Sequence, residues 1–207
     1  METNHDCQVN HTVSSEETEA QGAIEIFLRS IETKNLKYTN FVGDGDSSCF
    51  GKLQSALKEK YGDKYQVEKE ECVGHIQKRL GAALRKYKKD KKGVKLADGK
   101  SVGGKNRLTD AICDSMHNFY GEAIRNSQGD LKGMVNDIWA IPHHMVADPN
   151  IPLKEQHQFC PKHDNTWCKY WNKNREYTKT NRLPAVLMEE LKPIFTRLSD
   201  DKLLKRC

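Results

Sequence analysis

The sequence contains no apolar run near the roughly 20 residues that a membrane-spanning helix needs, and its mean hydropathy is −0.82. Its first eight residues are polar and include acids, unlike a signal peptide, and it has no Walker-type glycine-rich loop. These absences predict no membrane partner and exclude a P-loop nucleotide site. Apolar clusters nevertheless recur from Ala20 to Leu204, so we expect a folded protein after a disordered segment at residues 1–13.

The 207 residues also lack an even number of cysteines, because they include seven. An odd count argues against a closed disulfide framework, and no secretory signal places the chain in an oxidising compartment. We therefore expect the cysteines to be reduced thiols or metal ligands.

Acidic residues are scarce between Ile76 and Arg107, where twelve Lys and Arg side chains accompany only Asp90 and Asp98. This segment carries a net charge of +10, so the rest of the chain carries −5 of the overall +5. Such clusters favour polyanions such as nucleic acid, although a lysine run can also be the solvated end of a helix. The candidate DNA contacts are Lys78, Arg79, Arg85, Lys86, Lys88, Lys89, Lys91, Lys92, Lys95, Lys105 and Arg107.

Hydrophobic periodicity predicts alternating helices and strands in the first ninety residues. Ser14 and Glu17 form a capping-box pattern ahead of a helix that continues to about residue 31. Residues 38–42 and 65–69 have the pattern of short strands, and the helices predicted after them cover residues 50–61 and 73–88. This order predicts an α/β fold with a parallel sheet.

The strand pattern fades after the Gly- and Lys-rich loop at residues 93–106. Helical spacing returns at residues 108–124, 131–139 and 187–198, and we expect Pro142 and Pro193 to bend or end the last two helices. We therefore divide the chain into a disordered start at 1–13, an α/β core at 14–90 and a helical region at 91–207. A polar stretch at 147–181 within that region holds cysteines and histidines.

Asp44 and Asp46 flank a glycine just after the first predicted strand. Loops at the carboxyl ends of parallel strands often carry the chemistry of α/β proteins, and two carboxylates there could hold a hard cation such as Mg²⁺. A turn is the alternative, because Gly and Asp are common turn residues and Asp46 could cap the next helix.

Cysteine and histidine pairs indicate a possible zinc site. Cys72 and His75 lie three residues apart, and the polar stretch supplies His157, Cys160, His163 and Cys168. Structural Zn²⁺ takes four such ligands in a tetrahedron. We predict Cys72 and His75 together with Cys160 and Cys168, with His157 or His163 replacing one of them. His143 and His144 have the pattern of residues at a helix end rather than of ligands.

Several segments combine into a recognisable pattern: YTNFVGDGDSS at 38–48, EECVGHIQKRLG at 70–81, GGKNRLT at 103–109, DIWAI at 137–141, CP at 160–161, TWCKY at 166–170 and LKPIF at 191–195. Together these segments resemble Mutator-like DNA transposases over residues 12–207. The resemblance implies a partial ribonuclease-H-like core at 14–90, with a parallel or mixed sheet, and a mainly helical insertion at 91–207.

The resemblance also implies metal chemistry. An Asp-Asp-Glu triad would bind two Mg²⁺ or Mn²⁺ ions and act on a phosphodiester, with Asp44 matching the second Asp and Asp46 as the fallback. Related recombinases close a zinc site between a Cys-x-x-His pair and later ligands, which favours joining Cys72 and His75 to Cys160 and Cys168.

The sequence departs from the family at two catalytic positions. The first Asp belongs on a strand before residue 44, where we expect disorder and a helix, and no Asn-Glu-Ser-like motif with the final Glu follows the insertion. We therefore expect a transposase-derived DNA-binding protein that is catalytically incomplete as given. The alternatives are an active metal-dependent transposase or nuclease completed by another chain or a missing exon, and a zinc-stabilised interaction domain without a DNA role.

DNA is the partner that these readings favour, with self-association or association with a full-length transposase as further candidates. The DNA role and the basic cluster predict residence in the nucleus.

Overall fold

The computed structural model describes residues 14–43, 47–146, 150–164, 166–176 and 182–207. The chain forms two compact units, Met1–Glu71 and Cys72–Cys207, which we call the first and second units. The fold is mixed α/β and mainly helical. The boundary that we predicted after residue 90 falls inside the second unit, at the end of its first helix.

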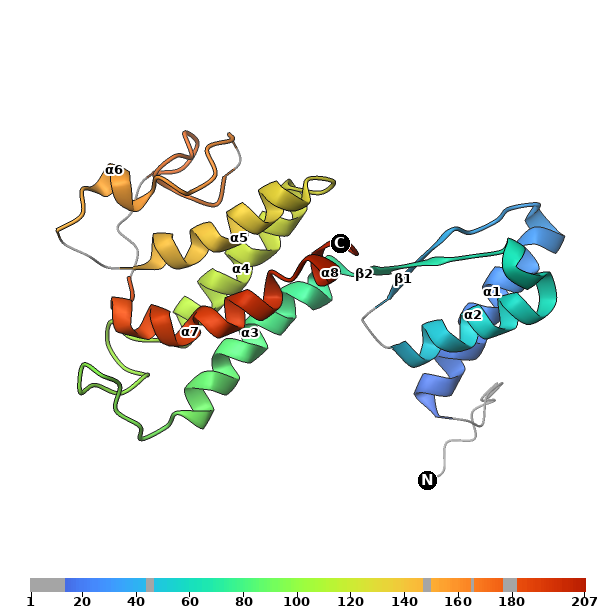
Figure 1. Cartoon of the computed structure of the whole chain (residues 1–207), viewed down its shortest axis with the longest axis horizontal. Helices are drawn as coiled ribbons and strands as arrows, with labels where there is room; N and C mark the ends of the chain where they lie inside the picture. The colour runs from blue at the N-terminus through green and yellow to red at the C-terminus, as the bar shows by residue number, and fades with distance from the viewer. Residues whose placement is uncertain (1–13, 44–46, 147–149, 165, 177–181) are drawn as a thin grey trace, which may run out of the picture. The chain divides into compact units, whose positions relative to one another are not determined.

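The first unit contains a small parallel sheet with two helices (Figure 1): α1 (Ser15–Lys34), β1 (Asn40–Gly43), α2 (Ser47–Tyr61), a 3₁₀ turn (Gly62–Lys64) and β2 (Glu68–Glu71). The strands pair in parallel, with Asn40 opposite Glu68 and Gly43 opposite Glu71. The predicted strand–helix–strand order and the parallel pairing are therefore confirmed.

Local signals set the ends of α1. The hydroxyl of Ser14 accepts a hydrogen bond from the backbone N–H of Glu17 at 3.3 Å, as the capping pattern predicts. At the other end Asn35 adopts a left-handed conformation with φ 51° and donates its N–H to Ile31. Between these ends α1 packs on α2, and Phe27, Leu53 and Leu57 are buried in the shared core.

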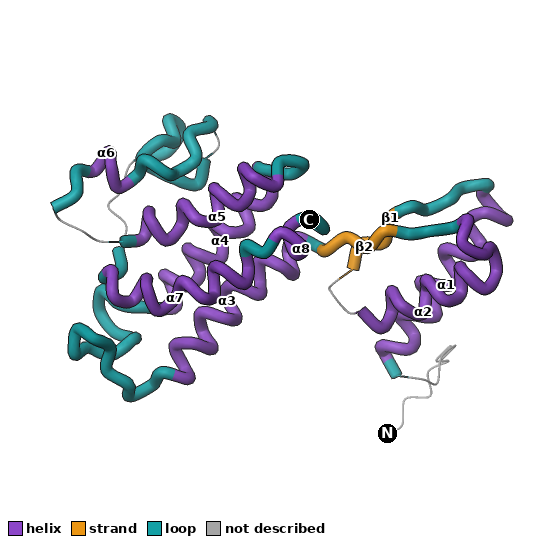
Figure 2. The backbone as a smooth tube through the Cα atoms, viewed as in Figure 1, coloured by secondary structure: helices purple, strands orange, loops and turns teal. Residues whose placement is uncertain are grey.

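The second unit is built from helices and loops (Figures 1 and 2): α3 (Val73–Asp90), α4 (Asp110–Asn126), α5 (Leu131–Met145), α6 (Leu153–Gln156), α7 (Ala185–Leu198) and α8 (Asp201–Leu204). Helix α4 lies between α3 and α5, and α7 packs on both α3 and α5. Their apolar faces form one core, in which the hydroxyl of Tyr120 donates to the carbonyl of Leu198 at 2.8 Å.

Two prolines lie inside helices, so neither Pro142, which we expected to bend or end its helix, nor Pro193, which we expected to interrupt its helix, ends one. Helix α5 passes through Pro142 to Met145, and α7 passes through Pro193 to Leu198. A proline inside a helix costs about 3 kcal/mol, but burial of Ile141, Pro142 and Met145 in the core offsets this cost for α5. The continuation of α5 places His144 in its last helical turn.

None of the helices in the described part of the chain is long and apolar enough to cross a membrane.

Candidate metal centre and nucleic-acid interface

Four buried side chains of the second unit converge at one point: His144, His157, Cys160 and Cys168. His144 comes from the end of α5, and the other three come from the loop that follows α6. One nitrogen or sulfur atom from each lies within 4.8 Å of the others. All four residues are at most 3% exposed, so the cluster is closed to solvent.

Three of the six separations in this cluster match the edges of a tetrahedral zinc site. Sγ of Cys160 lies 3.4 Å from Nδ1 of His144 and 3.8 Å from Nδ1 of His157, and Sγ of Cys168 lies 3.3 Å from the latter atom. Zn²⁺ bonds of about 2.0–2.3 Å give tetrahedron edges of about 3.3–3.8 Å. Two thiols and two imidazoles also form a common ligand set for structural zinc, so the four residues could hold this ion.

Short-range contacts hold the loop ligands in place. The N–H of Cys160 donates to the carbonyl of His157 at 3.1 Å, which closes a turn around the two ligands. Trp171 Nε1 donates to the same carbonyl at 2.8 Å, and the N–H of Cys168 donates to the hydroxyl of Thr166 at 3.1 Å. These bonds satisfy polar groups that burial would otherwise leave without partners.

Aromatic rings surround the cluster. Tyr170 stacks on His157 with centroids 4.6 Å apart and an interplanar angle of 6°. Trp167 stacks on Phe119 at 4.7 Å and meets His144 edge to face at 5.1 Å. Trp167 and Cys168, which are neighbours in the sequence, therefore both belong to this packed site. This apolar shell keeps water away from the ligands.

The pKa values of three cluster residues are shifted, and these shifts bear on cation binding. Burial lowers the pKa of His144, so its imidazole is neutral at pH 7. The hydrogen bond between the thiols raises the pKa of Cys160, and burial adds to this rise, whereas the same bond lowers the pKa of Cys168. Zinc takes both sulfurs as thiolates, so a metal ion bound here would displace the proton that the two sulfurs share.

Arg182 contacts the far side of one ligand. Its Nη2 lies 2.8 Å from Nε2 of His157, and Nη1 hydrogen bonds to the side-chain oxygen of Gln156. A guanidinium can only donate, so without a metal the ring proton of His157 belongs on Nδ1, facing the sulfurs. A metal on Nδ1 would move the ring proton to Nε2, and the Arg182 contact could not persist.

The structure brings together part of the predicted zinc set. His157, Cys160 and Cys168 are in the cluster, but its fourth member is His144 rather than Cys72 or His75, which stand at the start of α3. His163 is exposed. The sequence pattern indicated that His144 is a helix-end residue rather than a ligand; it does lie in the last turn of α5, but it also joins the cluster. The usable signal was its position on the buried face of α5, three residues after Ile141 and four after Ala140.

The two predicted catalytic carboxylates, Asp44 and Asp46, lie outside the described residues. The neighbouring geometry is known: β1 ends at Gly43 and α2 begins at Ser47. The described part of the chain contains no second cluster of three or more metal-ligand side chains besides the histidine–cysteine group.

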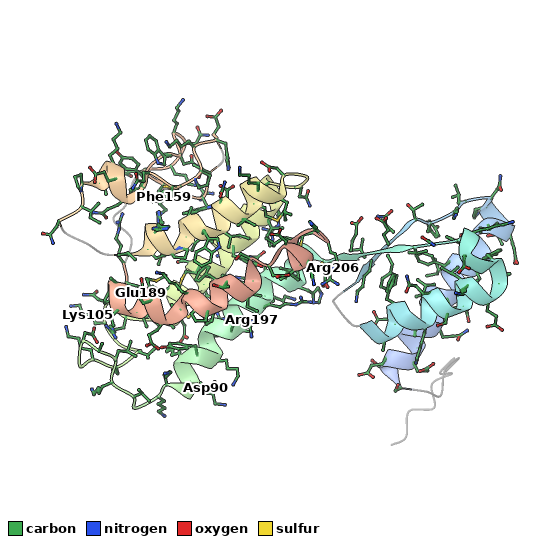
Figure 3. All side chains as sticks on the ribbon, viewed as in Figure 1. Asp90, Lys105, Phe159, Glu189, Arg197 and Arg206 are labelled. Atoms are coloured by element: carbon green, nitrogen blue, oxygen red, sulfur yellow. The ribbon has the colours of Figure 1, made fainter. Side chains whose placement is uncertain are left out.

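The basic segment covers most of α3 and the loop that leads to α4, where Asp90 and Lys105 are labelled in Figure 3. A hollow of about 740 Å³, which we call the basic hollow, opens there. Six of its lining residues are cationic and one is acidic: Arg85, Lys88, Lys89, Lys91, Lys92 and Lys95, with Asp110. Such a concave surface of one charge concentrates a polyanion.

Ion pairs divide the predicted DNA contacts into two groups. Several cations are paired within the protein: Arg85 with Asp114, Lys86 with Asp90, Lys88 with Asp110, and Lys91 with Glu190. By contrast, Lys78, Lys89, Lys92, Lys95 and Lys105 are exposed and have no ion pair among the described residues. These lysines are the ones whose charge is available to a ligand.

Arg107 has a different position from the lysines. It is 4% exposed, its Nη1 lies 2.5 Å from Oδ2 of Asp98, and its Nε donates to the carbonyl of Ser101 at 2.8 Å. The guanidinium therefore braces the loop at residues 98–107, a wall of the basic hollow, from the inside.

Comparison with known proteins agrees with the sequence resemblance. A family model for Mutator-like transposases matches residues 1–168, most of the chain. The chain therefore belongs to the Mutator-like transposase family. Neither a search of curated proteins nor a search of solved structures found a match.

Proposed function

We propose that this chain is a transposase-derived DNA-binding protein whose second unit is held together by zinc and whose basic hollow receives the DNA backbone. The observation that carries the proposal is the concentration of exposed, unpaired lysines around that hollow. Lys89, Lys92 and Lys95 line it and have no carboxylate partner among the described residues. Family membership supports DNA as the polyanion, because transposases act on DNA.

Zinc has a structural role in this proposal. The His144–His157–Cys160–Cys168 cluster joins the end of α5 to a loop that contains little regular structure of its own. Binding energy released at such a site stabilises the folded form, because the unfolded chain lacks the preformed site.

For the first unit we propose a partial ribonuclease-H-like core. The parallel β1–β2 pair supports this assignment, and Asp44 or Asp46 would be the carboxylate that binds Mg²⁺ or Mn²⁺. Residence in the nucleus and assembly with a second copy or a full-length transposase belong to the same proposal, since both follow from a role on DNA.

Salt dependence of DNA binding tests the proposal. The affinity of the whole chain for a fluorescent duplex is measured by anisotropy over a salt series, with zinc loaded. The triple variant Lys89→Gln, Lys92→Gln, Lys95→Gln removes the free charges of the basic hollow. Each lost phosphate contact flattens the slope of log affinity against log salt by about 0.9.

A matched control removes three exposed lysines elsewhere in the second unit: Lys132, Lys202 and Lys205. We expect the first variant to flatten the slope and the control to leave it unchanged. Equal slopes for both variants would contradict a role for the hollow, and absence of binding by the wild type would leave a zinc-stabilised interaction domain. Addition of Mg²⁺ or Mn²⁺ to the same mixtures then separates binding from cleavage.

A further inference from the structure

A loop segment at residues 150–176, which includes the short helix α6 and carries three of the cluster residues, also exposes apolar side chains. Ile151 is 39% exposed, Leu153 is 41% exposed and Phe159 is 56% exposed. Among the described residues of the second unit, Val94 is the only other large apolar side chain in this exposed class. Exposure of Phe159 is therefore a local property of this loop (Figure 3).

Phe159 is held in a defined position despite its exposure. It stands between His157 and Cys160, two members of the metal cluster, and the hydrogen bond from Cys160 to His157 closes the turn beneath it. Its ring lies against the exposed ring of His143, with centroids 4.7 Å apart and an interplanar angle of 41°. A bound metal would fix both ends of this turn and therefore the direction of the ring.

The segment that contains Phe159, residues 150–176, has a net positive charge. Residues 150–176 include five Lys and Arg side chains against three acids. Lys154 and Lys162 are exposed in this loop, and Nζ of Lys162 lies 5.0 Å from the centroid of the Trp171 ring. Cations on the same segment as an exposed aromatic ring favour nucleic acid over an apolar protein surface, because the cations can attract phosphates while the ring stacks on a base.

We propose that Phe159 and His143 form a stacking surface for an unpaired base of DNA. The proposal rests on the DNA-binding function above and names the form of DNA that this loop selects. A base in a duplex is already stacked on both faces, so only an unpaired or terminal base can lie on the Phe159 ring. Loops fixed by zinc that present aromatic rings recognise unpaired bases in this way.

The test compares three fluorescent DNAs with the same duplex: blunt, with an overhang of five unpaired nucleotides, and with an overhang of five abasic residues. The two overhangs carry equal backbone charge and differ only in their bases. Affinities are measured by anisotropy with the whole, zinc-loaded chain. We expect wild type to bind the base-bearing overhang about tenfold tighter than the abasic one, as expected for stacking of a single base.

Variants at an exposed position should leave the fold intact, which a thermal unfolding scan checks. Phe159→Ala and Phe159→Leu should reduce the tenfold ratio to about one, whereas Phe159→Trp should retain it. Leu153→Ala removes another exposed apolar side chain of the same loop and should leave the ratio unchanged. Removal of zinc with a chelator should also abolish the ratio, because the turn beneath the ring loses its anchor.

The outcomes separate the stacking surface from the general DNA role. A wild-type ratio near one, or a ratio that Phe159→Ala leaves intact, overturns the stacking surface even when blunt duplex binds well. The stacking surface is supported if Phe159→Leu loses the ratio as fully as Phe159→Ala does and Phe159→Trp retains it. Absence of binding to all three DNAs overturns both proposals.

Discussion

Nδ1 of His144 lies 3.4 Å from Sγ of Cys160, although the two residues are 16 positions apart in the sequence. One stands in the last turn of α5 and the other in the loop after α6, so a metal ion between them would tie the helical core to that loop. Exchange of the His144 ring for a smaller side chain should therefore affect both metal content and stability.

The first prediction concerns the ligand set. His144→Ala should lower bound zinc from one per chain to well below one and lower the Tm, because a structural site with three ligands holds the metal weakly. His143→Ala is the matched control, since His143 is its exposed neighbour on the same helix. Native mass spectrometry gives the zinc content, and thermal unfolding gives the Tm.

Cys72 and His75, at the start of α3, test the alternative ligand set. The double variant Cys72→Ser, His75→Ala should retain one zinc per chain, because neither residue is in the buried cluster. Loss of zinc from this variant together with full zinc in His144→Ala would instead support the ligand set that sequence spacing predicts.

The second prediction concerns Arg182. Residues that contact a metal-bound histidine usually accept its free N–H, and their loss weakens metal binding about 10–100-fold. Arg182 cannot accept this N–H, because its guanidinium can only donate and it points toward Nε2 of His157. Arg182→Gln offers an acceptor at that place and should bind zinc at least as tightly as wild type.

Competition with a chromophoric zinc chelator measures this affinity, with Arg182→Met as the variant that offers no acceptor. Weaker binding by tenfold or more in the Gln variant would mean that the guanidinium supports the metal-bound site, either through Gln156 or through the backbone of Val146, which it also contacts.

Local patterns in the sequence predicted the elements well. The capping pattern at Ser14 and the apolar spacing of Leu80 and Leu84 report interactions within one helix turn or one helix face, and the structure confirms both. The parallel pairing of β1 and β2 followed from the helix between them, which leaves room for a crossover.

The histidine–cysteine cluster was harder to predict because its members meet through tertiary packing. His157, Cys160 and Cys168 are close in sequence and were found, whereas His144 depends on the passage of α5 through Pro142, which burial of the surrounding residues permits. The Cys-x-x-His spacing of Cys72 and His75 is typical of zinc ligands, but spacing alone does not say which distant ligands the fold brings near.

The third prediction distinguishes a residue that stabilises a loop from a residue that contacts DNA. Arg107 and Lys105 were both candidate DNA contacts, yet Arg107 is buried against Asp98 and Lys105 is exposed. Arg107→Gln should lower the Tm by several degrees, because it leaves the Asp98 carboxylate and the Ser101 carbonyl without their partner. Lys105→Gln should leave the Tm unchanged and flatten the DNA salt slope by about 0.9.

Thermal unfolding and the anisotropy salt series, measured on the same two proteins, check this contrast. An unchanged Tm for Arg107→Gln would show that the guanidinium does not brace the loop in solution.

The fourth prediction concerns the carboxyl of Asp137 on α5. Burial raises its pKa, and the hydrogen bond from the Ser127 hydroxyl, 2.9 Å long, opposes that rise only in part. Since the folded-state pKa lies above the unfolded value, this group favours folding below the unfolded pKa, and that contribution is lost as pH rises through the folded pKa. At neutral pH the ionised carboxylate therefore costs stability.

Asp137→Asn keeps an oxygen that can accept from Ser127 and removes the charge. Its Tm should exceed that of wild type at pH 7, and the difference should shrink as pH falls through the raised folded-state pKa toward the unfolded value of 3.8, because the folded wild-type carboxyl is then increasingly protonated. Asp164→Asn, at an exposed position of the same unit, is the control and should show no such pH-dependent difference. Thermal unfolding between pH 4 and 8 measures all three proteins, and a lower Tm for Asp137→Asn throughout this range would show that the charged carboxylate stabilises α5 instead.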